Sequence, residues 1–433
     1  MKKRSQLTAV ILLLFGIAFA GCAGERRVLP VTERTVPTEA VTVPDVAGEQ
    51  AETSKEVPTT EPIATPTVTI TPTPTAAPTP TRAPELSLVM VGDVLLHTRV
   101  QESCHEEDGS YDYSVLFAQV EEEIRQADLA LVNQEVIIGG AELGISGYPQ
   151  FNAAYELGTA LTEAGFDMVC HATNHALDQH RQGLLNCLRF WKTNYPEMMI
   201  LGISETQEER SRITIYEKAG IRVAVLNYTY GTNGIPLPED MPYGVHLLEE
   251  ETVTEELRRA KALADFVIVC PHWGTEYRLE PDKNQKKWAE LFLREGVDLV
   301  IGTHPHVIEP IVWMENEETG ERMLVYYSLG NFVNWTSGKG VGVADRMIGG
   351  MAQVTIGRNE AGEAVITGYG IRALVTQVEY GYHGVTTYFL SDYPEELARR
   401  NEIVKQDASF DPEYGRALCE KVWGAVDFFE KRY

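Results

Sequence analysis

An α/β domain is the fold class that the sequence predicts, and three observations lead to it. From Leu86 onward, short apolar runs alternate with longer amphipathic stretches. The runs have the length of strands that are buried on both faces. Alternation of such strands with helical stretches indicates a layered sheet covered by helices. After Glu309 the pattern changes to successive short strands, so we expect a β-rich C-terminal part.

Each expected element can be located along the chain. The predicted core strands are LSLVMV, LALVNQ, DMVCHA, VAVLNY, DFVIVC and VDLVIG. Helices are predicted between them at about 113–126, 153–164, 179–193, 252–263 and 283–295. The later strands are predicted in PIVWM, RMLVYYSL, MAQVTIG, EAVITGYGIRALVTQVEY and VTTYFL. We expect a final helix over roughly 412–431.

The first 21 residues have the pattern of a secretory signal. A basic start, Lys2, Lys3 and Arg4, precedes an apolar run that is short for a membrane span. The run ends in FAGC, which resembles a bacterial lipobox with Cys22 as the lipidated residue. The alternative is an uncleaved N-terminal anchor helix. Either interpretation places the protein on the extracytoplasmic face of the cell membrane, and the first attaches it by lipid.

Residues 22–84 are predicted to form a linker without a core. Their Thr/Pro-rich composition offers too little apolar surface to offset the entropy of ordering, so we expect a disordered, semi-extended spacer. Residues 85–345 are assigned to the main domain. Residues 346–433 are expected to supply the C-terminal strands and helix that complete it.

The net charge of the chain narrows the range of its binding partners. The formal net charge is −26, and removal of Lys2, Lys3 and Arg4 with the signal makes it −29. A strongly acidic chain argues against nucleic acid and against anionic lipid headgroups as partners.

Beyond Cys22 five cysteines remain, an odd number that excludes complete pairing within the chain. Cys170 and Cys270 end predicted strands, where buried free thiols are expected.

Polar side chains gather where the predicted strands end. In open α/β sheets ligands bind beyond the carboxyl ends of the strands, so these positions are the first place to look for a site. Carboxylate, amide and imidazole groups at five such positions are the ligand types of Zn, Mn or Fe. The segments concerned are GDVLLH, NQE, HATNHALDQH, PHWGTEY and GTHPH.

The segment GTHPHVIEP places two histidines on either side of Pro305. Proline favours an extended conformation in the preceding residue, and residues i and i+2 of an extended segment point to the same side. His304 and His306 are therefore predicted to aim at one point. The alternative is a pair of surface-loop histidines.

Taken together, GDVLLH, NQE, TNHALD, PHWGTEY, GTHPHV and YSLGNFV resemble the CapA family of bacterial capsule and poly-gamma-glutamate synthesis proteins, relatives of calcineurin-like metallophosphatases. The resemblance covers roughly residues 86–345. It implies a four-layer α/β/β/α metallophosphatase-like sandwich with one or two divalent metal ions, Mn, Zn or Fe. The metal ligands that it implies are Asp93, Glu135, Asn174, His272, His304 and His306.

His175 is the catalytic residue that the resemblance implies. Asp178, three residues later, is expected to accept a hydrogen bond from His175 and to fix its tautomer. Three side chains stay undecided: His97, which a helical turn would place beside Asp93, and Glu276 and Asn331. His171 and His180 are expected to be structural or surface residues, and Trp273 a packing residue.

Two departures from the metallophosphatase pattern matter. NQE stands where those enzymes have a Gly-Asp pair, and the usual Asp-x-His is missing. The first hypothesis is therefore a surface-anchored, metal-dependent hydrolase or transferase of exopolymer metabolism. The second is a non-catalytic metal-binding scaffold in a polymer synthesis or export complex. The expected partners are the membrane, an anionic exopolymer and subunits of such a complex.

Overall fold

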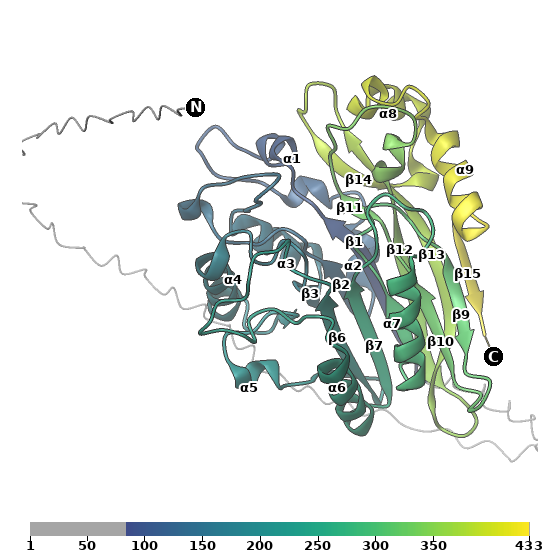
Figure 1. Ribbon diagram of the computed structural model, residues 1–433. Helices are drawn as coiled ribbons and strands as arrows, with labels where there is room; N and C mark the ends of the chain where they lie inside the picture. The colour runs from purple at the N-terminus through teal and green to yellow at the C-terminus, as the bar shows by residue number, and fades with distance from the viewer. Residues whose placement is uncertain (1–83, 433) are drawn as a thin grey trace, which may run out of the picture. The chain divides into compact units, whose positions relative to one another are not determined.

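The computed structural model describes residues 84–432. The predicted signal, Cys22 and nearly all of the predicted linker lie outside the described residues. Two β-sheets pack face to face, and helices cover the outer face of each sheet (Figure 1). The predicted four-layer α/β/β/α arrangement is therefore confirmed.

The first sheet has nine strands. Its central strands β1 to β4 run parallel, and β12, β13 and β14 continue the sheet antiparallel from β1. In spatial order the strands are β14 (Val385–Phe389), β13 (Ala364–Val378), β12 (Ile348–Arg358), β1 (Leu86–Val94), β2 (Leu129–Asn133), β3 (Met168–Cys170) and β4 (Met199–Leu201), with β11 (Asn331–Val333) on β1 and β15 (Phe428–Lys431) on β13.

The second sheet has six strands, with four parallel strands between two antiparallel edges. Its order is β5 (Thr214–Lys218), β6 (Ile221–Thr229), β7 (Phe266–His272), β8 (Leu299–Ile301), β10 (Arg322–Tyr326) and β9 (Ile311–Glu315). All strands predicted from the apolar runs are present.

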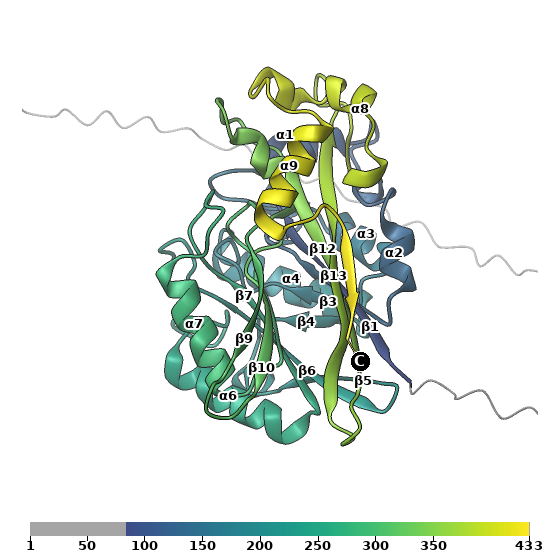
Figure 2. The same cartoon turned by 90° about the vertical axis from the view of Figure 1, so that its right-hand side faces the viewer.

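Helices flank the two sheets, as Figure 2 shows for α2 and α3 on one side and α6 and α7 on the other. They are α1 (Thr98–Ser103), α2 (Glu121–Gln126), α3 (Glu156–Ala164), α4 (His180–Asn194), α5 (Gln207–Arg210), α6 (Glu250–Leu263), α7 (Lys283–Arg294), α8 (Glu395–Arg400) and α9 (Pro412–Trp423). Short 3-10 turns are η1 (Ser114–Leu116), η2 (Ala141–Leu143), η3 (Val343–Met347), η4 (Leu390–Asp392) and η5 (Glu402–Lys405). Within residues 84–432, none of the helices combines the length and the apolar character that crossing a bilayer requires.

Two helix predictions were wrong in part. The helix expected over 113–126 consists of the turn η1 and the separate helix α2. The final helix begins as expected, with Asp411 as N-cap and Pro412 at its first position, but it ends at Trp423. Gly424 adopts a left-handed conformation that stops the helix, and residues 428–431 form β15, which pairs with β13.

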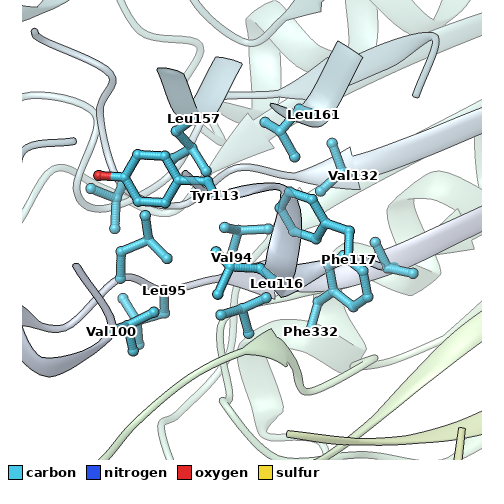
Figure 3. Close-up of a cluster of buried hydrophobic side chains, with 14 of the residues drawn as sticks. Val94, Leu95, Val100, Tyr113, Leu116, Phe117, Val132, Leu157, Leu161 and Phe332 are labelled. Carbon is cyan, nitrogen blue, oxygen red and sulfur yellow. The ribbon is translucent and has the colours of Figure 1, made fainter. Parts of the chain in front are cut away.

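The hydrophobic core lies in three layers. One fills the space between the sheets, and one lies under the helices of each outer face. Figure 3 shows part of the layer outside the nine-stranded sheet, where Phe117 stacks on Phe332 with ring centroids 5.5 Å apart. Val94 and Val132 belong to this cluster and lie at the ends of β1 and β2. Their burial holds the carboxyl ends of both strands in place.

β1 approaches its neighbour unusually closely just before Asp93. A Cβ atom added to Gly92 would lie 1.9 Å from the main-chain oxygen of Gly330, so only glycine fits. The main-chain nitrogen of Asp93 donates to that same oxygen over 3.1 Å. This contact sets the position of the Asp93 side chain.

Candidate metal centre

The side chains predicted as ligands come together at the carboxyl ends of both sheets. Asp93 and Glu135 lie at the ends of β1 and β2, and Asn174 follows β3. His272 is the last residue of β7, and His304 and His306 follow β8. All six are buried. The centre is therefore built from both halves of the sandwich.

Glu135 lies in the middle of these residues. Its Oε1 atom is 3.6 Å from His306 Nε2, 3.7 Å from His272 Nε2 and 4.0 Å from His175 Nε2. Both carboxylate oxygens are buried and have no hydrogen-bond partner among the described residues. A buried carboxylate without a partner is costly, and coordination of a cation removes that cost.

Two groups of side chains are spaced to hold a metal ion. One is Glu135, His272 and His304, and the other is Asp93, Glu135 and His306. Within each group the ligand atoms all lie within 4.8 Å of one another. His304 Nδ1 is a further buried atom without a partner among the described residues. The residues fit a divalent metal, and Glu135 belongs to both groups.

The electrostatics of the centre agree with this fit. Burial is the main cause that raises the pKa of the Glu135 carboxyl well above its usual range, and Asp93 adds to it while His306 opposes it. Burial and neighbouring imidazoles lower the pKa values of His272 and His304, so both rings are neutral, the form that binds metal.

His306 behaves differently from the other two imidazoles. Burial alone would lower its pKa, but the charges of Glu135 and Asp93 and a hydrogen bond to Asp93 outweigh burial and raise it to about 9. A proton on His306 thus supplies positive charge that the carboxylates need. A metal ion would supply more.

Neighbouring polar groups orient the ligands. Asn133 Nδ2 donates to Asp93 Oδ1 over 2.8 Å, and Thr303 Oγ1 lies 3.0 Å from His272 Nδ1. His272 Nε2 lies 2.8 Å from Asn174 Oδ1. With its proton on Nε2 the ring donates to that oxygen, and Nδ1 accepts from Thr303 Oγ1 and Asn133 Nδ2; with its proton on Nδ1 it donates to Thr303 and leaves Nε2 free to bind a metal ion.

His175 and Asp178 form the pair expected from the sequence. His175 Nδ1 lies 2.6 Å from Asp178 Oδ2, which also accepts a 2.7 Å hydrogen bond from the main-chain nitrogen of Phe151. The Phe151 ring meets the His175 ring edge-on, with centroids 4.6 Å apart. The pair is fixed, and Nε2 of His175 faces Glu135.

The backbone prediction for GTHPH was wrong. His304 has φ 98° and His306 has φ 56°, so neither residue is extended. The two rings still lie close, with centroids 5.5 Å apart, but each belongs to a different ligand group. The loop is held in this form by hydrogen bonds such as Tyr277 N to Pro305 O, over 2.8 Å, which the preference of a residue before proline does not include.

The side chains left undecided can now be placed. The segment from Asp93 to His97 is not helical, because β1 continues to Val94 and α1 begins only at Thr98, with His97 as its N-cap. The half-buried ring of His97 meets the ring of Phe151 edge-on, with centroids 5.3 Å apart. Glu276 is exposed at the rim of the centre, and Asn331 contacts His306 directly.

Three residues were expected to be structural, surface or packing residues, and their surroundings agree with this. His171 is buried and accepts a hydrogen bond from Trp191, while His180 is exposed. Trp273 packs against Phe292 and donates to the main-chain oxygen of Tyr327. All five cysteines of the described part of the chain are buried and unpaired, including Cys170 and Cys270.

Sequence reasoning did not assign roles to Asn133, Thr303 and Tyr230. Asn133 and Thr303 each stand within two residues of a predicted ligand, which is a usable signal for supporting groups. The Tyr230 ring lies 4.7 Å from the His304 ring, and no local pattern marks it.

The chain has two relatives that are named for PGA or capsule biosynthesis. It is 30% identical over 263 residues to the PGA biosynthesis protein CapA of Bacillus subtilis (strain 168), which covers 58% of this chain and 64% of that protein. It is 27% identical over 271 residues to the capsule biosynthesis protein CapA of Bacillus anthracis, with coverages of 59% and 62%. The chain thus spans less than two thirds of the length of each relative.

Among solved structures, a phosphatase from Mycoplasma pneumoniae aligns with a TM-score of 0.41 at 14% identity, over 68% of this chain and 94% of that one. A likeness of that size carries no functional inference. The family model described as "Bacterial capsule synthesis protein PGA_cap" matches residues 87–336, more than half of the 433 residues. The chain therefore belongs to the PGA_cap family of bacterial capsule synthesis proteins.

Proposed function

We propose that this protein is a metal-dependent hydrolase or transferase that acts on exopolymer at the outer side of the cell membrane. The observation that carries the proposal is Glu135, a buried carboxylate without a partner among the described residues, surrounded by three imidazoles. The supporting context is the family, which is one of capsule synthesis.

The residues that would hold the metal are Asp93, Glu135, Asn174, His272, His304 and His306. When bound, the metal, Mn, Zn or Fe as one ion or two, supplies Lewis-acid polarisation of a phosphoryl or acyl oxygen and lowers the pKa of water.

In this proposal His175 moves the proton. Asp178 accepts from Nδ1, which leaves Nε2 directed at the centre. In this orientation Nε2 would take a proton from the attacking group and return it to the leaving oxygen of a phosphoester or the leaving nitrogen of an amide, and Asp178 would stabilise the charged ring between the two events. Phe151 packs on the ring and keeps its orientation.

The test is hydrolysis by the metal-loaded full-length chain. A panel of phosphoester and peptide substrates, including poly-gamma-glutamate, should yield turnover that a chelator abolishes and that added metal restores. Absence of turnover across the panel, with metal bound, would count against an enzyme.

A non-catalytic metal-binding scaffold in a synthesis or export complex is the second candidate. NQE in place of the Gly-Asp pair of metallophosphatases favours it. This candidate predicts stoichiometric metal without turnover, and loss of complex assembly when the ligands are replaced.

A further part of the proposal is the attachment of the protein to the membrane, which rests on the N-terminal sequence. FAGC motivates a lipid anchor on Cys22. Cys22→Ser should release the protein from membranes. Membrane retention equal to that of the wild type would mean that lipid on Cys22 is not the anchor.

A further inference from the structure

Arg346 lies beside the metal centre on the turn η3. Its main-chain oxygen accepts hydrogen bonds from Asn331 Nδ2 over 2.9 Å and from Asn334 Nδ2 over 3.3 Å. The same Asn331 side chain contacts His306 Nδ1 at 3.1 Å. One amide therefore connects the backbone of Arg346 to a predicted metal ligand.

The guanidinium of Arg346 stacks on Tyr277. Its Cζ atom lies 3.5 Å from the centroid of the Tyr277 ring, whose own centroid lies 6.0 Å from that of His306. The Tyr277 side chain is 47% exposed, so this stack reaches the solvent. Hydrogen bonding of Tyr277 N to Pro305 O ties the stack to the histidine loop.

Most of the hydrogen-bonding capacity of the guanidinium is unused. Nη1 donates to Thr336 Oγ1 over 2.9 Å, and Nε and Nη2 have no partner within residues 84–432. No carboxylate of that part of the chain lies within 4.0 Å of the guanidinium. An Arg fork that stacks on a ring and keeps free donors is suited to bidentate binding of a carboxylate or phosphate.

The surroundings place this charge toward the centre. Burial is the main cause that lowers the pKa of His97 to about 4, and the charge of Arg346 is among the smaller contributions. Glu276, adjacent to Tyr277, is an exposed acidic group on the same rim. In a chain of net charge −26, an unpaired cation next to the centre offsets repulsion of an acidic substrate.

We propose that Arg346, stacked on Tyr277, forms an anion-binding subsite beside the metal centre and selects substrates that carry a carboxylate or phosphate next to the group held there. The inference rests on the proposed function only in that substrate reaches the metal centre; it holds for an enzyme and for a polymer-binding scaffold alike.

Binding to the metal-loaded full-length chain tests the subsite. The probes are a γ-linked glutamate oligomer, its uncharged γ-linked glutamine counterpart and inorganic phosphate. Loss of charge-assisted hydrogen bonds should weaken binding of an anionic probe by roughly 10- to 100-fold in Arg346→Gln. Weaker glutamate binding identifies a carboxylate subsite, and weaker phosphate binding a phosphate subsite.

Arg189→Gln is the matched control, because Arg189 is an exposed arginine on α4 whose replacement removes the same charge. It should bind every probe as the wild type does. Tyr277→Leu is a second variant that leaves Arg346 in place and removes the stack from a half-exposed position. It should weaken anionic binding several-fold, which keeps the test decisive where Arg346→Gln does not fold.

Metal content is measured in each variant. Anionic binding at wild-type strength in Arg346→Gln, or in Tyr277→Leu where that variant alone folds, overturns the subsite. Equal weakening of the uncharged oligomer overturns it as well. Failure of the hydrolase proposal shows as absent turnover in the wild type, a result that leaves the binding comparison intact.

Discussion

His306 and Asn331 contact each other twice. His306 Nδ1 lies 3.1 Å from Asn331 Oδ1, and Asn331 Nδ2 donates to the main-chain oxygen of His306 over 3.1 Å. Asp93 Oδ2, a second acceptor, is also 3.1 Å from His306 Nδ1. Because both oxygens accept, Nδ1 carries a proton, and Nε2 is directed at Glu135.

Replacement of Asn331 by Ala should therefore weaken metal binding by about 10- to 100-fold, the usual effect of losing a group that orients a ligand. Asn334→Ala is the matched control, since Asn334 also donates to Arg346 O but has no hydrogen bond to His306 among the described residues. Titration of the chelator-treated protein with Zn or Mn measures both affinities. Equal affinities in the two variants would show that the contact does not support the metal.

Removal of both loop imidazoles should empty the centre or halve its metal content. His304 and His306 belong to different ligand groups that share Glu135, so the double variant His304→Ala, His306→Ala leaves neither group complete. Elemental analysis at pH 7.5 is the measurement, and His180→Ala, at an exposed position, is the control. Wild-type occupancy in the double variant would refute the centre.

Replacement of His175 should lower turnover while the metal content stays unchanged, unlike replacement of a metal ligand. His175→Ala removes the proton carrier, for which a loss of about 10²- to 10⁴-fold in kcat is expected, while the metal is retained. Asp178→Asn should lower kcat as well, because it disturbs the tautomer of His175. Steady-state kinetics with metal analysis of the same samples gives both quantities. Unchanged turnover in His175→Ala would favour the scaffold.

His171 should make stability depend on pH. Burial lowers its pKa from 6.5 to about 3, so the unfolded chain takes up a proton before the folded one does. Stability is therefore lost as pH falls below 6.5, by about 2 kcal/mol between pH 7.5 and 5. His171→Gln keeps an acceptor for Trp191 and lacks this titration.

The difference in free energy of unfolding between wild type and His171→Gln should consequently shrink by that amount from pH 7.5 to 5. Urea unfolding with chelator present at both pH values measures it. Parallel pH profiles of the two proteins would show that folding does not lower the pKa of His171.

The strands, and the positions of the candidate ligands at their carboxyl ends, were predictable because both depend on local pattern. A buried strand has an apolar run, and its carboxyl end is the place where a polar residue such as Asp93 or His272 can meet others. The conformation of His304 and the end of α9 were not predictable in this way. They depend on partners far away in the chain: Tyr277 for the loop, and β13 for residues 428–431.

The contacts at the rim of the centre could not be predicted from the sequence either. Among the described residues, Arg346 is connected to His306 through Asn331 and Tyr277, and these contacts join η3, β11 and the loop after β7. Asn331 itself could be suspected from SLGNF, but its partners could not. A single sequence records the spacing of groups along a strand and not the contacts between loops.

Glu135 comes from one sheet, and His272 and His304 come from the other. No fragment of the chain that lacks either sheet can assemble the centre, and in the unfolded chain Glu135 is more than a hundred residues from both His272 and His304. A metal ion held there would therefore bind after the sheets have packed and would join the two sheets. Because it would bind the folded state alone, such an ion would stabilise the packing of the two sheets, and withholding it would shorten the lifetime of the folded protein.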